Sequence, residues 1–142
     1  KDLIEELGIK CKINGQKIQG NNKNTLGDID VLIINPLKKK IIVAEVKNFS
    51  LKKSPYEIYQ EYLSVFCDSE KSKCYLSKHK ARVDWVKAHI SDVVSQYKLP
   101  KGNWKVDDVM IVNEIIVSNQ YYHKKQKILL YSEITEKSIS NI

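Results

Sequence analysis

The chain has 142 residues and carries 24 Lys and Arg against 17 Asp and Glu, a formal net charge of +7. This length favours a single domain with its own core, and no apolar run is long enough to span a bilayer. Cys11, Cys67 and Cys74 are odd in number and irregularly spaced, which favours reduced thiols in a cytoplasmic protein over a disulfide framework. A basic domain suits a polyanionic partner such as nucleic acid, although a lysine-rich coding bias gives the same composition.

The first predicted element is an amphipathic segment over residues 2–7, which has the spacing of a helix end, with Gly8 as its stop. Because this helix is already under way at Lys1, we expect a fragment of a longer protein that lacks the start of its first core helix. A weak strand over 9–19 and a polar, mobile loop over 20–24 follow.

Two strands are predicted next, at 28–35 and 39–47, joined by an Asn-Pro turn. The second strand contains an almost unbroken apolar run, residues 41–44 and Val46, which is typical of a strand buried on both faces. Glu45 and Lys47 close this strand and are two residues apart, so their side chains share one face. Charges in such a place are costly to bury unless they are paired, hydrogen-bonded or metal-bound.

Asp30 opens the first of these two strands. If the strands pair antiparallel, Asp30 lies near Glu45 and Lys47. Two carboxylates and an ammonium would then converge at one edge of a sheet, an arrangement that can hold a hard divalent cation beside a charge stabiliser. The alternative is structural, with Asp30 capping a turn and the other two residues forming an exposed ion pair.

The second half of the chain is predicted to be mostly helical. Ser54-Pro55 opens a helix, because proline favours the first helical position. A long helix over roughly 77–97 has an apolar stripe at helical spacing. A strand over about 106–117, a final strand over 128–131 and a short helix from Ser132 complete the chain. This order predicts an α/β fold.

The segment 27–48 resembles the PD-(D/E)XK nuclease superfamily, which includes restriction endonucleases, Holliday-junction resolvases and repair nucleases. The motif is Asp30, 14 intervening residues and then Glu45-Val46-Lys47. With the apolar strand before Glu45 and Asn48 after Lys47, it is most similar to the nuclease-related domains called NERD. The resemblance implies a restriction-endonuclease-like αβββαβ core, with a mixed central sheet and helices on both faces. Outside this segment the resemblance depends only on the order of the elements.

The resemblance also implies an activity, namely Mg²⁺-dependent endonucleolytic hydrolysis of DNA phosphodiester bonds in restriction, defence or repair, with Mn²⁺ able to substitute. Asp30, Glu45 and the backbone carbonyl of Val46 would bind the metal. Lys47 would orient the attacking water or stabilise the charge of the transition state. Asp28 shares the face of Asp30 by strand alternation, and is either a second ligand or a turn-capping residue.

Two family features match this chain poorly or weakly. The superfamily tends to place an acidic residue on its first core helix, where Glu5 and Glu6 lie too near the helix end, so the activity of the fragment alone is open. It also often directs a Gln or Lys from the helix after the motif toward the site. Gln60 resembles that residue, and a solvated glutamine is the alternative.

Further candidates for nucleic-acid contact lie on the predicted long helix. His79, Arg82 and His89 lie off its apolar stripe, with Trp85 beside them. Such a basic and aromatic surface could grip a phosphate backbone or stack a base. Plain surface residues, or for Trp85 a core residue, are the alternatives.

The intact motif Asp30, Glu45 and Lys47 favours an enzyme over a catalytically silent nucleic-acid-binding or assembly module on the same fold. The expected partners are nucleic acid and the other domains of the longer chain, with no membrane. DNA versus RNA and strandedness stay open. A cut through both strands of a duplex needs two active sites, which a homodimer would supply.

Overall fold

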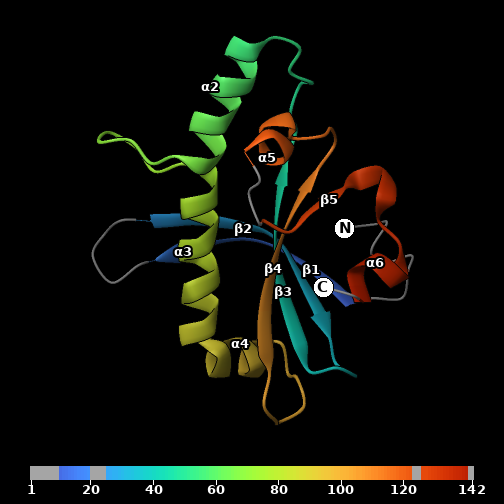
Figure 1. Ribbon diagram of the computed structural model, residues 1–142. Coiled ribbons are helices and arrows are strands. Elements are labelled where there is room, and N and C mark those ends of the chain that lie inside the picture. The colour runs from blue at the N-terminus through green and yellow to red at the C-terminus, as the bar shows by residue number, and fades with distance from the viewer. Residues whose placement is uncertain (1–9, 20–24, 123–125, 141–142) are drawn as a thin grey trace.

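A computed structural model of the chain describes residues 10–19, 25–122 and 126–140 (Figure 1). These residues form an α/β fold on a mixed five-stranded sheet with the order β1-β2-β3-β4-β5. The strands are β1 (Lys10–Gln19), β2 (Thr25–Asn35), β3 (Lys40–Lys47), β4 (Lys105–Val112) and β5 (Ile128–Leu130). β1, β2 and β3 pair antiparallel, whereas β4 joins parallel to β3, and β5 parallel to β4.

The helices lie mainly between β3 and β4 in the chain. They are α2 (Pro55–Phe66), α3 (Tyr75–Ala88), α4 (Ile90–Gln96), α5 (Val117–Tyr121), the 3₁₀ turn η1 (Tyr131–Glu133) and α6 (Glu136–Ser140). None of the described helices is long and apolar enough to cross a membrane. The predicted order of three strands, helices, strand and strand is confirmed, while the helix expected over 2–7 and the loop over 20–24 lie outside the described residues.

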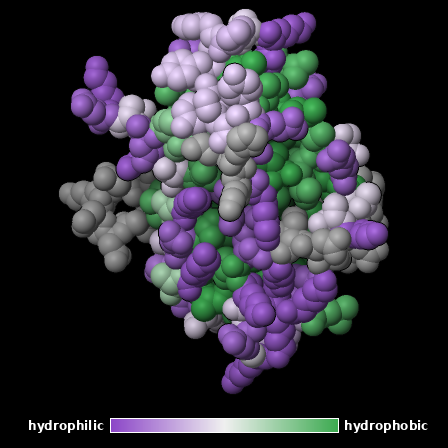
Figure 2. All heavy atoms as spheres, in the orientation of Figure 1, coloured by the Kyte–Doolittle hydropathy of each residue, from purple (hydrophilic) through white to green (hydrophobic). Residues whose placement is uncertain are grey.

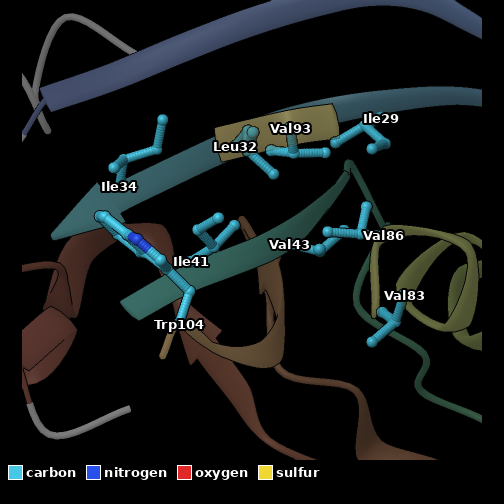
Figure 3. Packing of buried hydrophobic residues seen from close by; sticks show 9 residues of the cluster. All are labelled: Ile29, Leu32, Ile34, Ile41, Val43, Val83, Val86, Val93 and Trp104. Atoms are coloured by element: carbon cyan, nitrogen blue, oxygen red, sulfur yellow. The ribbon is translucent and has the colours of Figure 1, made fainter. Parts of the chain in front are cut away.

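Alternating strand residues build two hydrophobic layers, one on each face of the sheet. One layer contains Ile29, Leu32 and Ile34 of β2, Ile41 and Val43 of β3, Val83 and Val86 of α3, Val93 of α4, and Trp104 (Figure 3). The other contains Val31, Ile33, Ile42, Ala44, Val109 and Ile111 of the strands, with Ile134 and Ile139 of the η1–α6 segment. The sheet is therefore covered by helices on both faces, as the sequence predicts.

The start of α2 agrees with the prediction at Ser54-Pro55. The hydroxyl of Ser54 accepts a hydrogen bond from the backbone N–H of Glu57 at 3.3 Å. In return, the Glu57 carboxylate accepts one from the Ser54 N–H at 3.0 Å. This reciprocal pair satisfies two N–H groups that a helix start leaves open. The buried residue Val65 then packs α2 against β4 through Met110.

The single long helix predicted over 77–97 is wrong, because α3 begins at Tyr75 and a break at His89 separates α3 from α4. The backbone N–H of His89 donates to the carbonyl of Trp85 at 3.0 Å, and its ring Nδ1 lies 2.9 Å from the same oxygen. The histidine thus ends α3 with a non-helical backbone, at φ −111° and ψ 28°. The turn places the apolar stripe of α4 on the core.

The strand predicted over 106–117 is too long, since β4 ends at Val112. The side chain of Asn113 accepts from the Phe49 N–H at 2.6 Å and donates to the Phe49 carbonyl at 3.0 Å. These two bonds replace the next rung of the β3–β4 ladder, and the chain turns away. The last strand likewise ends one residue early, at Leu130, and the helix expected from Ser132 begins after η1, at Glu136.

Candidate functional site

The site begins where β2 separates from β3. The β2–β3 ladder ends at the pair Val31–Ala44. On its other edge β2 carries a bulge, because the β1 partners of Ile29 and Leu32 are two residues apart and not three. Asp30 lies in this bulge. A bulge re-aims the side chains around it, and here the Asp30 carboxylate is turned toward the end of β3.

The Asp30 carboxylate is fixed by two groups of β3. Its Oδ2 accepts a hydrogen bond from the backbone N–H of Val46 at 2.8 Å. The same oxygen lies 3.7 Å from the Lys47 ammonium, which is 2.8 Å from Glu45 Oε1. One ammonium therefore connects both carboxylates, and the structure brings Asp30, Glu45 and Lys47 together at the carboxyl end of β3.

Glu45 is almost completely buried, with 3% of its surface exposed. Its Oε2 accepts a hydrogen bond from Nη2 of Arg82 on α3. Nδ1 of His79, one helical turn earlier, lies 3.9 Å from the same oxygen. A buried carboxylate requires such partners, because an unpaired charge in this environment would be strongly destabilising.

The His79 ring connects the motif to a third carboxylate, on β4. His79 is fully buried, and its Nε2 lies 3.5 Å from Asp108 Oδ2. Gln126 donates to the same oxygen at 3.0 Å. The imidazole, with Gln126 adding to its effect, lowers the pKa of Asp108 to about 2 against the opposing effect of burial. We call the six residues Asp30, Glu45, Lys47, His79, Arg82 and Asp108 the site cluster.

The expectation that His79 and Arg82 form an exposed surface is wrong. Both lie on the inward face of α3, beside Val83 and Val86, and only 7% of Arg82 is exposed. His89 is half-buried and stacks on Trp85, with ring centroids 4.2 Å apart. A contact of these residues with nucleic acid stays a prediction, and for the two buried ones it would require access through the site.

The remaining candidates lie around the site cluster or outside the described residues. Asp28 is exposed, and no hydrogen bond or ion pair joins it to the described residues of the site cluster. Gln60 is also exposed, and no hydrogen bond or ion pair joins it to the described residues of the site cluster. Glu5 and Glu6 belong to the segment that the structure does not describe.

A pocket lies between α2, the loop that follows it and the start of α3. Its volume is about 440 Å³, and Gln60, Tyr75 and Lys78 are among its lining residues. Tyr75 connects this pocket to the motif, because the centroid of its ring is 5.7 Å from the Lys47 ammonium. An apolar pocket of similar size, about 410 Å³, lies between α4 and the segment before β4 and contains no member of the site cluster.

The tyrosine-rich surface of α2 and α5 lies at the same end of the sheet as the pocket lined by Gln60 and Tyr75. Tyr62 of α2 and Tyr122, the residue that follows α5, pack with ring centroids 4.1 Å apart. Figure 2 shows that residues of intermediate hydropathy gather over these two helices, while strongly hydrophilic ones gather around the α4–β4 loop. The motif end of the sheet therefore carries a mixed aromatic and polar surface.

Sequence reasoning missed Asp108 and the structural role of Gly27. Asp108 pairs with Val43 in the parallel β3–β4 ladder, which places its carboxylate on the same face as Glu45. An acidic doublet at the start of an otherwise apolar strand was the available signal. Gly27 has φ +78°, and a Cβ there would lie 3.1 Å from Arg82 Nη1, so glycine leaves the room that the guanidinium fills.

The comparisons with known proteins do not identify a family. No family model matches this chain, and neither the curated proteins nor the solved structures provide a match.

Proposed function

We propose that this chain is a divalent-metal-dependent endonuclease domain that hydrolyses phosphodiester bonds of DNA, in a restriction, defence or repair context. The observation that carries the proposal is the shared contact of the Lys47 ammonium with Asp30 and Glu45 at the end of a buried strand. Carboxylates and an ammonium held at this spacing are the groups needed to position a phosphate, a hard cation and an attacking water.

The topology supports the same proposal. The resembled PD-(D/E)XK superfamily has an αβββαβ core, with the motif carried by the second and third strands. From its first strand onward, the described chain has this order, with β1, β2 and β3 antiparallel and β4 added parallel to β3. Because many α/β domains share such an order, the topology supports the motif and does not replace it.

The available donors suit a Mg²⁺ or Mn²⁺ ion. Among the residues that the structure describes, no group of three or more His, Cys, Asp or Glu side chains could hold a metal ion by itself. Asp30, Glu45 and the carbonyl of Val46 would supply hard oxygen ligands. Mg²⁺ is usually held by one or two carboxylates together with waters and substrate phosphates, so the donor set fits. When bound, the ion would polarise the scissile phosphate and lower the pKa of a coordinated water.

The protein side chains would provide the rest of the chemistry. Lys47 is a compact charge with movable donors, and it would move from the carboxylates to the phosphate as negative charge develops there. Its side chain is 28% exposed, so it can reach a substrate at the surface of the site. The Val46 N–H holds Asp30 in place, which reduces the reorganisation needed during the reaction. The nearby pocket lined by Gln60 and Tyr75 would accept part of the nucleic acid.

One observation favours a second candidate, a catalytically silent nucleic-acid-binding or assembly module. Glu45 already has the Lys47 ammonium on one oxygen and the Arg82 guanidinium on the other. A carboxylate neutralised in this way can serve as a structural ion pair without any metal.

The test is cleavage of plasmid DNA, single-stranded DNA and RNA with Mg²⁺ or Mn²⁺, using Lys47→Met and Glu45→Gln beside the wild type. Lys40→Met is the matched control, because Lys40 lies at the opposite end of β3 in an ion pair with Asp107 at 2.9 Å. We expect metal-dependent cleavage that falls by about 100-fold or more in both site variants and is retained in the control.

Folding of each variant is checked by its melting temperature. Cleavage that survives both site substitutions would place the chemistry elsewhere. No cleavage of any of the three substrates, together with no change of melting temperature on adding metal, would leave the silent module as the function.

A further inference from the structure

Arg82 is unusual in this chain, because it is the single arginine among the 24 basic residues. It is also almost fully buried, with 7% of its surface exposed, whereas charged residues are rarely buried unless they are paired. Arginine stays protonated in proteins and presents a planar fork of donors that lysine cannot reproduce. Its position at Glu45 therefore indicates a role that a lysine would not fill.

The Arg82 guanidinium is held by contacts with β2 and β3. Nη2 donates to Glu45 Oε2, and Nη1 donates to the Leu26 carbonyl at 3.4 Å. Gly27 has no side chain to obstruct Nη1. The Nε–H is buried and has no hydrogen-bond partner among the described residues. Arg82 is thus held mainly through its two terminal nitrogens, one of which is on the carboxylate that the proposed metal would need.

The charges around Glu45 already balance without a metal ion. The carboxylates of Asp30 and Glu45 carry two negative charges, and Lys47 and Arg82 supply two positive ones at contact distance. A divalent ion added to these four groups would leave them with an excess of two positive charges around the buried Glu45 carboxylate. Such an excess is unfavourable, so the ion can bind well only if a cation withdraws from Glu45.

We propose that Arg82 is an internal counter-cation that competes with the divalent ion for Glu45 and thereby sets the metal affinity of the site. This inference rests on the proposed function, since it concerns the same carboxylates. Lys47 is less suited to this role because it contacts both carboxylates and is partly exposed, so it can turn toward substrate without leaving the site. In the metal-free protein, Arg82 keeps Glu45 neutralised and the fold stable.

The test compares Mn²⁺ binding by isothermal titration calorimetry, and the rise in melting temperature with Mn²⁺, in the wild type and Arg82→Met. Arg82→Lys is a second variant that keeps the charge and loses the fork. Lys87→Met is the matched control: it removes one positive charge from the same helix, where Lys87 is half-exposed and 3.9 Å from Asp84.

Arg82→Met is expected to melt lower than the wild type without metal, because Glu45 loses a partner. It is also expected to bind Mn²⁺ about tenfold more tightly than the wild type. Its melting temperature should therefore rise more when Mn²⁺ is added. In both melting temperature and Mn²⁺ affinity, Arg82→Lys should lie between the wild type and Arg82→Met. Lys87→Met should match the wild type in both measurements. If Arg82→Met does not fold, the same ordering between Arg82→Lys and the wild type decides the question.

Two results would overturn the inference in different ways. Equal or weaker Mn²⁺ binding in the Arg82 variants, with binding in the wild type, would show that Arg82 does not compete, and would leave the nuclease proposal standing. No Mn²⁺ binding and no thermal effect in any variant would remove the metal site itself, and the proposed function with it.

Discussion

Asp108 lies against the buried ring of His79, and Asp108→Asn would remove its charge while keeping the shape of the side chain. His79 Nε2 is 3.5 Å from Asp108 Oδ2. The imidazole and, to a lesser degree, the Gln126 amide lower the pKa of Asp108 from its ordinary value of 3.8 to about 2. The ionised carboxylate is therefore favoured in the folded protein, and the substitution is expected to destabilise the fold near neutral pH.

The magnitude of this effect follows from the pKa difference. One pKa unit corresponds to about 1.4 kcal/mol, so the lowering gives at most about 2.5 kcal/mol. Because 30% of the Asp108 side chain is exposed, solvent screening reduces the expected loss to about 1 kcal/mol. A depressed folded pKa contributes stability that is complete above the unfolded pKa and is lost as the pH falls through the folded one. The penalty should therefore be about halved at about pH 3.

Urea unfolding at about pH 7 and about pH 3 measures this difference directly. Asp84→Asn is the matched control, because Asp84 lies on α3 with 75% of its side chain exposed, and its loss should change little at either pH. A penalty for Asp108→Asn that is the same at both pH values would refute the electrostatic reasoning. It would show instead that the substitution acts through packing.

Two further substitutions test the local structure that positions the site. Gly27→Ala is expected to cost about 1–2 kcal/mol in urea unfolding, because alanine disfavours φ +78° and its methyl would press on Arg82. A gain in stability, as for a glycine without conformational constraint, would contradict this. Ser54→Ala removes the hydroxyl that caps α2 and is expected to cost about 1 kcal/mol, measured by circular dichroism during urea unfolding. An unchanged midpoint would show that the cap contributes nothing.

The hairpin and the motif were predictable because they depend on short-range rules. Side chains alternate along a strand with period two, so Glu45 and Lys47 had to share a face. An Asn-Pro turn between apolar runs favours antiparallel pairing, which brings Asp30 to the end of β3. The local spacing of residues was therefore enough to predict that Asp30, Glu45 and Lys47 lie together. It was not enough to predict the bulge at Asp30.

The rest of the site cluster depends on contacts between distant segments. Asp108 reaches the site only through the parallel β3–β4 ladder, and the register of that ladder cannot be deduced from the sequence of either strand alone. His79 and Arg82 were expected at the surface because charged and histidine side chains are usually exposed. Yet His79, Val83 and Val86 recur at the spacing of one helical face, and only the buried charge of Glu45 explains why polar residues continue that stripe.

The two kinds of strand pairing in this sheet have a consequence for the order of folding. The β2–β3 hairpin closes a turn of four residues, whereas 57 residues separate the end of β3 from the start of β4. Closing the short loop costs less chain entropy, so we expect Asp30 and Glu45 to meet in water before α3 and β4 arrive. Pulse-labelling hydrogen exchange would show this as early protection of β3 on its β2 side. The docking of α3 then buries the Glu45 carboxylate and delivers the Arg82 guanidinium in one step, so neither charge has to be dehydrated alone.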